Sequence, residues 1–183
     1  MQLKEGIRIL ALAGAPFRSE SANELIIGVI GRKGVVEGAV SFHVEVDGLD
    51  SASSLIKTIK VSRFRSQIKL IALAGVTFAG MNIINIEEVE KKLGIPVLAV
   101  TRRKPHKGLM RNALKYSKHR EEKLKLFSRL CSVLEIKRES GYYLQYTSGR
   151  GEVKGFTAEA AELLRLSHII ASSLGSGESK GRI

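Results

Sequence analysis

Two ten-residue segments of this chain are nearly the same, and they constrain the fold more than any other feature. Arg8–Phe17 and Lys69–Phe78 align without gaps and share five residues. Each is an apolar run that closes in a small-residue turn, which is the pattern of a buried strand. If the two strands are parallel neighbours, Ala13-Gly14 and Ala74-Gly75 lie together at the carboxyl edge of a sheet, where open α/β sheets form their pockets. The alternative is that two buried strands simply need similar apolar sequences.

The rest of the chain predicts an α/β fold in which helices cover a mixed sheet. Two apolar stretches flank a glycine-rich basic turn and predict hairpin strands, after which helical and strand patterns alternate. The predicted elements are strands at 7–13, 25–30 and 35–46, a helix at 51–62, a strand at 68–74, a helix at 87–93, a strand at 95–101, a basic helical segment at about 102–131, a hairpin at 133–146 and a last helix capped by Thr157. We expect a single domain over residues 1–183, because no linker interrupts the pattern, and a flexible tail at about 175–183.

Positive charge is concentrated in one stretch. The chain has a net charge of +12, and the segment from Thr101 to Arg138 holds thirteen basic and only three acidic side chains. A clustered basic surface is typical of polyanion binding, so we expect DNA or RNA as the partner. The alternative is a solvated helix face in a basic protein. The candidate phosphate-binding residues follow the predicted strand end directly: Arg102, Arg103, Lys104, Lys107, Arg111 and Lys115.

Cysteine content and hydropathy exclude several classes of protein. The single cysteine, Cys131, leaves no disulfide framework and no cysteine-based zinc cluster, and it lies on an apolar helical stripe typical of a core. No apolar run approaches the ~20 residues that span a bilayer. Residues 1–12 lack the apolar region of a signal peptide. We therefore expect a cytoplasmic protein with no membrane partner; the oligomeric state stays open.

Aspartate is scarce, which limits the metal sites that the chain can build. Of the 18 acidic residues only Asp47 and Asp50 are aspartates. His43, Glu45 and Asp47 share one face of a predicted strand and could bind one metal ion, although a solvent-facing strand has the same pattern. Asp50 precedes a predicted helix, and we expect it to be the N-cap.

Three turn-centred motifs resemble those of the archaeal endonuclease dU family. They are Val46-Asp-Gly-Leu-Asp50, Gly75-Val-Thr-Phe-Ala-Gly-Met-Asn82 and Gly94-Ile-Pro-Val-Leu-Ala-Val-Thr-Arg-Arg-Lys-Pro105. The resemblance implies a ribonuclease-H-like fold related to endonuclease V. It also implies a metal-dependent endonuclease that acts on deaminated DNA of the deoxyuridine or inosine type. That activity would use Mg²⁺ or Mn²⁺, because hard cations bound by carboxylate oxygens stabilise both the attacking and the leaving oxygen.

The chain departs from this family where the family carries its metal-binding acids. The first strand of the relatives ends in two aspartates and the fourth in Asp-Gly, whereas this chain has Ala13, Gly14 and Ala74. We therefore interpret it as a nucleic-acid-binding protein on an endonuclease V-like scaffold, catalytically impaired and without a cofactor. The alternative is an active nuclease whose metal is held by substitute acids, for which the candidates are Asp47, Asp50 and Glu20, with Glu24 beside them.

Overall fold

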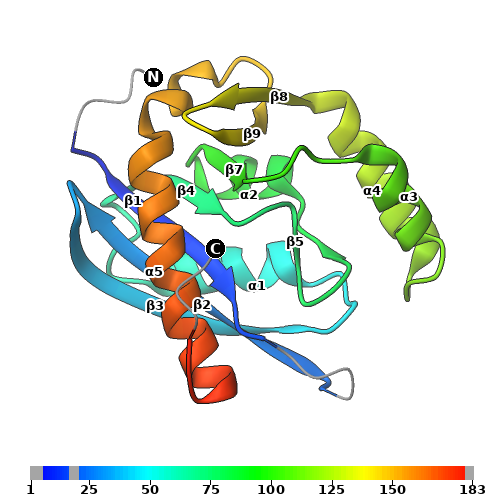
Figure 1. Ribbon diagram of the computed structural model, residues 1–183, viewed down its shortest axis with the longest axis horizontal. Helices are drawn as coiled ribbons and strands as arrows, with labels where there is room; N and C mark the ends of the chain where they lie inside the picture. The colour runs from blue at the N-terminus through cyan, green and yellow to red at the C-terminus, as the bar shows by residue number, and fades with distance from the viewer. Residues whose placement is uncertain (1–5, 17–20, 180–183) are drawn as a thin grey trace.

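A seven-stranded sheet with the order β3-β2-β1-β4-β7-β9-β8 forms the centre of the structure, a computed structural model that describes residues 6–16 and 21–179 (Figure 1). A two-stranded sheet, β5-β6, lies outside it. The strands are β1 (Arg8–Gly14), β2 (Asn23–Arg32), β3 (Val35–Glu45), β4 (Ile68–Leu73), β5 (Thr77–Phe78), β6 (Asn82–Ile83), β7 (Val97–Thr101), β8 (Leu134–Glu139) and β9 (Tyr142–Thr147). The helices are α1 (Ser51–Val61), α2 (Ile86–Leu93), α3 (Lys107–Leu114), α4 (Arg120–Val133), the short 3-10 helix η1 (Gly151–Phe156) and α5 (Thr157–Ser176).

The strand directions identify the fold. β1, β2 and β3 form an antiparallel meander, and β4 and β7 continue the sheet parallel to β1. This is the ribonuclease-H-like arrangement, extended at its far edge by the antiparallel pair β9 and β8. The predicted fold class is therefore confirmed. Ala11 pairs with Ala72 and Leu12 with Leu73, so the two nearly identical segments are parallel neighbours, as the sequence predicts.

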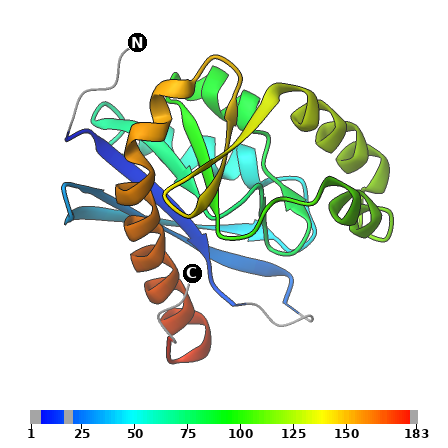
Figure 2. The ribbon, with the colours of Figure 1, turned by 45° about the horizontal axis from the view of Figure 1, so that its top comes forward.

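Helices cover both faces of the sheet because the central strands are apolar on both sides. β1 is buried from Ile9 to Ala13, which requires a partner layer on each face. α5 packs across β1 and β2 on one face and buries Leu163 and Leu164, whereas α1 and α2 pack on the other face (Figure 2). Each helix is amphipathic, and its apolar stripe faces the sheet. The layers leave the carboxyl ends of β1, β4 and β7 along one edge.

Three sequence-based details need correction. The predicted tail at about 175–183 begins too early, because α5 continues through Ser176 and ends at Gly177, which adopts a left-handed φ of 82°. Residues 180–183 of that prediction lie outside the described residues. Thr157 is the first residue of α5 rather than its cap. Asp50 does occupy the N-cap position of α1, but its side chain makes no capping hydrogen bond there. Its Oδ1 instead accepts a hydrogen bond from the buried side-chain amide of Asn82.

The basic segment forms two helices, α3 and α4, that lie side by side at the margin of the molecule (Figure 1). We call residues 102–133 the basic arm. In the described part of the chain, no helix has the length and apolar character needed to cross a membrane.

Candidate functional site

The ends of β1 and β4 border a cavity of about 400 Å³. Ala13 and Gly14 close β1 and Ala74 follows β4, so the pairing of these strands brings the three residues together at one edge. None of the three carries a side chain that could bind a ligand through oxygen or nitrogen. The polar groups that line the cavity are Glu24 of β2, Thr77 of β5 and His168 of α5.

Glu24 fills the space in which residue 14 would carry its side chain. A Cβ added to Gly14 would lie only 1.7 Å from Glu24 Oε1, so glycine at this position makes room for the glutamate. The side chain is 5% exposed, and its Oε2 atom is buried without a hydrogen-bond partner in the described residues. The edge that lacks acids on β1 and β4 thus receives one carboxyl group from β2.

Burial changes the ionisation of this carboxyl group. Desolvation raises the pKa of Glu24 from its usual 4.5 to about 7, although a hydrogen bond with the Ala79 backbone opposes the shift. Near neutral pH the group therefore exchanges between a neutral and a charged form. A cation bound at this carboxyl would displace the proton from the neutral form.

Asp47 and Asp50 are occupied by structural hydrogen bonds. Asp47 has a left-handed φ of 55°, and its Oδ1 accepts a 2.8 Å hydrogen bond from the Met81 backbone. Asp50 Oδ1 accepts from Asn82 Nδ2 at 2.7 Å and from the Glu45 backbone at 3.1 Å. Asp47 and Asp50 thus connect the turn that follows β3 to Met81 and to Asn82 at the start of β6. Glu20, the third substitute acid, lies outside the described residues.

The strand-face residues His43, Glu45 and Asp47 do not gather into a metal site. His43 is exposed, and Glu45 forms a 3.7 Å ion pair with Lys118. Over residues 6–16 and 21–179, no three His, Cys, Asp or Glu side chains cluster so that they could hold a metal ion. The residues described at the strand ends therefore do not fit the carboxylate-bound metal pair that the family resemblance implies, since Glu24 is the single acid that lines the cavity.

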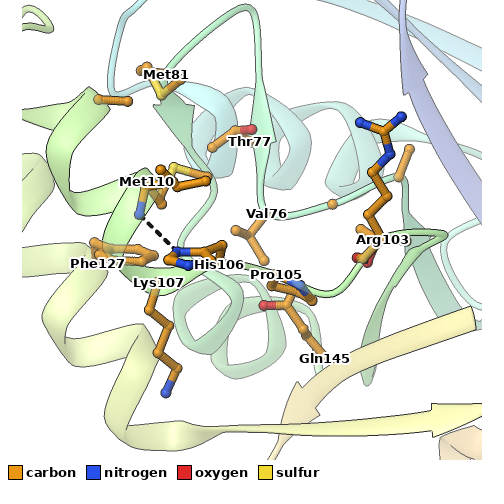
Figure 3. Close-up of a pocket in the computed structure, with 15 residues that line it drawn as sticks. Val76, Thr77, Met81, Arg103, Pro105, His106, Lys107, Met110, Phe127 and Gln145 are labelled. Carbon is orange, nitrogen blue, oxygen red and sulfur yellow. Dashed lines mark hydrogen bonds between the residues drawn. The ribbon is translucent and has the colours of Figure 1, made fainter.

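A second cavity of about 430 Å³ adjoins the first, because Ala74 and Thr77 line both. Its walls are largely apolar, and Met81, Met110 and Phe127 line one side of it (Figure 3). Arg103, His106 and Lys107 lie around its rim. An apolar chamber with a few polar and cationic groups at the rim is the usual form of a site for a small organic ligand.

The six cations predicted to bind phosphate are all exposed on the basic arm. Arg103 and Lys107 line the second cavity, which places them beside Ala74 and Gly75 as the sequence suggests. Lys107 also donates to the Cys131 carbonyl at 3.3 Å. Cys131 is partly buried against the main core. Other basic residues of the arm have structural partners; Arg129, for example, forms a bidentate pair with Glu87 at 2.8 and 2.9 Å.

The arm is fixed to the sheet by a buried lysine. Lys123 is 0% exposed, and its Nζ donates a 2.6 Å hydrogen bond to the Asp47 carbonyl. Burial lowers the pKa of this amine, while the nearby Asp47 and Glu45 carboxylates oppose the shift. Leu114, Phe127 and Leu130 complete the attachment as part of the main core. The arm is thus attached to the core, and its exposed cations Arg103 and Lys107 lie next to the second cavity.

The sequence does not show that Glu24 and Gly14 share one position in space. Glu24 is a candidate in the sequence only because it follows the first strand, and the spacing gives no reason to link it with Gly14. Gly14 pairs with Ile26, two residues along β2 from Glu24, so their closeness becomes visible only once the register of the two strands is known.

The collision between residue 14 and Glu24 leads to a direct prediction. In Gly14→Ala, the added Cβ displaces the Glu24 carboxyl, which is the end of a flexible side chain and can swing into the adjoining cavity. Contact with water then lowers the pKa of Glu24 from about 7 towards 4.5, and an NMR titration of the side-chain carboxyl carbon measures it. Gly155→Ala is the control, because nothing lies within 4 Å of its added Cβ. An unchanged Glu24 pKa in Gly14→Ala would contradict this arrangement.

Comparisons with known proteins agree with the fold. A family model described as endonuclease dU matches residues 5–175. A UPF0215 protein of Pyrococcus horikoshii is 33% identical over 190 residues, covering 98% of this chain and 97% of the relative. The crystal structure of an Archaeoglobus fulgidus protein of unknown function has a TM-score of 0.83 and 29% identity, with 93% of this chain and 99% of that chain covered. Ciona intestinalis endonuclease V, solved in complex with inosine-containing DNA, has a TM-score of 0.49 and 10% identity, with coverages of 88% and 79%.

Proposed function

This chain belongs to the endonuclease dU family, and on that premise we propose that it binds nucleic acid without cleaving it. One observation carries the proposal. The exposed cations of the basic arm border the same strand edge at which Ala13, Gly14 and Ala74 supply no acid. A cation-rich, carboxylate-poor edge attracts phosphate but lacks the oxygen ligands of a two-metal nuclease.

The geometry gives each part of this surface a role in binding. The cations of the arm contact the phosphate backbone, and Arg103 and Lys107 hold the phosphates closest to the cavity. The apolar chamber between Met81, Met110 and Phe127 receives one unpaired base, which is desolvated there against flat and polarisable side chains. Phosphate contacts set the position of the strand, and the chamber selects a base that is free to leave its stack.

The metal-dependent alternative rests on one group. Among the described residues, Glu24 supplies the one carboxyl of the first cavity, and Thr77 and His168 are the other polar side chains that line it. Because the described residues at this edge supply a single carboxyl, fewer than a two-metal site needs, we favour binding without cleavage.

A binding assay across salt concentrations tests the proposal. We expect labelled single- and double-stranded DNA and RNA to bind in EDTA, with an affinity that falls by about 10³–10⁵ between 50 and 200 mM salt, as for proteins that make about six to ten phosphate contacts. Fluorescence anisotropy measures it. No binding at low salt, or binding without a steep salt slope, would contradict a phosphate-contacting surface.

A cleavage assay tests the second half of the proposal. Uracil- and inosine-containing duplexes incubated with Mg²⁺ or Mn²⁺ are expected to stay intact on a denaturing gel. Cleavage that disappears in Glu24→Gln would show instead an active site built on this one carboxyl. Cleavage that disappears only in Asp47→Asn would assign the metal to the turn after β3.

A further inference from the structure

The turn between α3 and α4 presents an aromatic ring to solvent. Tyr116 is 91% exposed, which is more than any other large apolar side chain in the described part of the chain. By contrast, Tyr146 is 1% exposed, and Tyr143 lies against Arg138 with 5.8 Å between the ring centre and the guanidinium carbon. An exposed tyrosine offers a flat apolar face on which an aromatic ring can stack.

Hydrogen bonds order the turn that carries this ring. The Tyr116 N–H donates to the Ala113 carbonyl at 3.2 Å, and Ser117 Oγ donates to the Leu114 carbonyl at 3.0 Å, so the turn continues the hydrogen bonding of α3. Leu114 is fully buried, and the Lys118–Glu45 ion pair ties the far side of the turn to β3. Because the backbone of the turn is already ordered, little conformational entropy of this backbone is lost when Tyr116 binds a partner.

The surroundings of Tyr116 indicate what it meets. Exposed cations surround it along the chain, with Lys115 beside it and Arg111 and Arg120 on the flanking helices. A partner must therefore offer negative charge together with a flat apolar face. A nucleic acid strand offers both in alternation, because phosphates flank every base and every base has a π-face. An acidic protein surface supplies the charge but not the regularly spaced rings.

We propose that Tyr116 stacks on an unpaired nucleobase of a strand whose adjacent phosphates are held by Lys115. This rests on the proposed function and adds to it a second base contact at the tip of the arm, apart from the chamber lined by Met110 and Phe127. A strand that reaches from the chamber to the tip follows α3, whose exposed Arg111 lies between the two.

Equilibrium binding of a single-stranded oligonucleotide that carries 2-aminopurine tests the stacking contact. The chain has no tryptophan, so the fluorescence of the probe is observed without interference. Wild-type protein and Tyr116→Phe are expected to quench the probe at one or more positions along the strand. Tyr116→Ala is expected to lose the quenching at one of these positions and to bind about tenfold more weakly, because stacking contributes on that order per base.

Lys115→Ala is the matched control, since it removes a charge at the neighbouring exposed position. It is expected to lower the slope of log affinity against log salt by about one, whereas Tyr116→Ala leaves the slope unchanged. Equal affinity and equal quenching in Tyr116→Ala and Tyr116→Phe would overturn the stacking contact while leaving the binding function intact. A changed salt slope in Tyr116→Ala would also overturn it. Absence of binding by the wild-type chain would overturn the proposed function and the stacking contact together.

Discussion

Replacing the six arm cations by glutamine is expected to lower nucleic-acid affinity by a factor on the order of 10⁵ at 50 mM salt, and by less at 200 mM. The variant changes the residues Arg102, Arg103, Lys104, Lys107, Arg111 and Lys115, all of which are exposed. Each phosphate contact contributes about 0.9 to the slope of log affinity against log salt on duplex DNA, so the slope should fall by about five when all six are lost. Anisotropy titrations at four or five salt concentrations measure both quantities.

The control for this variant lies at the opposite edge of the sheet. Six exposed cations stand near the amino ends of β4 and β7, on α1, α2 and the loop between α1 and β4: Lys57, Lys60, Arg63, Arg65, Lys91 and Lys92. Their replacement by glutamine changes the net charge by the same amount. If binding depends on the arm, this control loses only the small part of the affinity that comes from long-range attraction. Equal losses in the two variants would mean that the chain binds through its overall charge, and would contradict a defined surface.

Replacing Glu24 by glutamine is expected to make the folded protein progressively more stable relative to wild type as the pH rises. The carboxyl has a pKa of about 7 when folded and its usual 4.5 when unfolded, so below pH 4.5 it is neutral in both states. Above pH 4.5 the unfolded chain releases the proton more readily than the folded chain, and the stability contributed by the neutral form is lost as the pH passes through 7. From pH 4 to pH 8 the difference in unfolding free energy between Glu24→Gln and wild type should grow by about 3 kcal/mol.

Urea unfolding at several pH values measures this effect. Glu121→Gln is a suitable control, because Glu121 is an exposed acid on α4. That variant should keep the pH dependence of the wild type. Replacement of His168 by glutamine in each background separates any contribution from the histidine that lines the same cavity. Parallel pH profiles for wild type and Glu24→Gln would show that the carboxyl is solvated in the folded protein.

The basic arm and the carboxyl that fills the strand edge belong to different elements of the fold: the arm contains α3 and α4, and Glu24 lies on β2. The arm that we propose to bind phosphate is attached to the sheet through Lys123 and the core residues Leu114 and Phe127. The group that occupies the strand edge is a buried carboxyl with a partly neutral character. Under the proposed function, phosphate binding and metal chemistry depend on different elements of the fold, so the first would not require the second.

Much of the fold could be predicted from local pattern. The apolar runs ending at Ala13 and Ala74, the glycine that ends α2 and the hairpin after α4 are set by the period of burial and by turn residues, and these are properties of a few neighbouring positions. The helix end at Ser176 could not be predicted in this way. The polar, glycine-rich sequence there favours a loop, but Gly175 packs closely against Pro16 and Ala15 at the end of β1.

The sequence by itself determined the sheet-forming segments, the concentration of positive charge after β7 and the absence of acids at residues 13, 14 and 74. Each of these is carried by residue type and order alone. Only the tertiary structure decided that Glu24 replaces the missing side chain of Gly14, that Asp50 bonds to Asn82 rather than capping α1, and that Tyr116 has no covering layer. The reason is physical: these facts depend on strand register and on distances between residues far apart in the chain, and such distances exist only once the layers have packed.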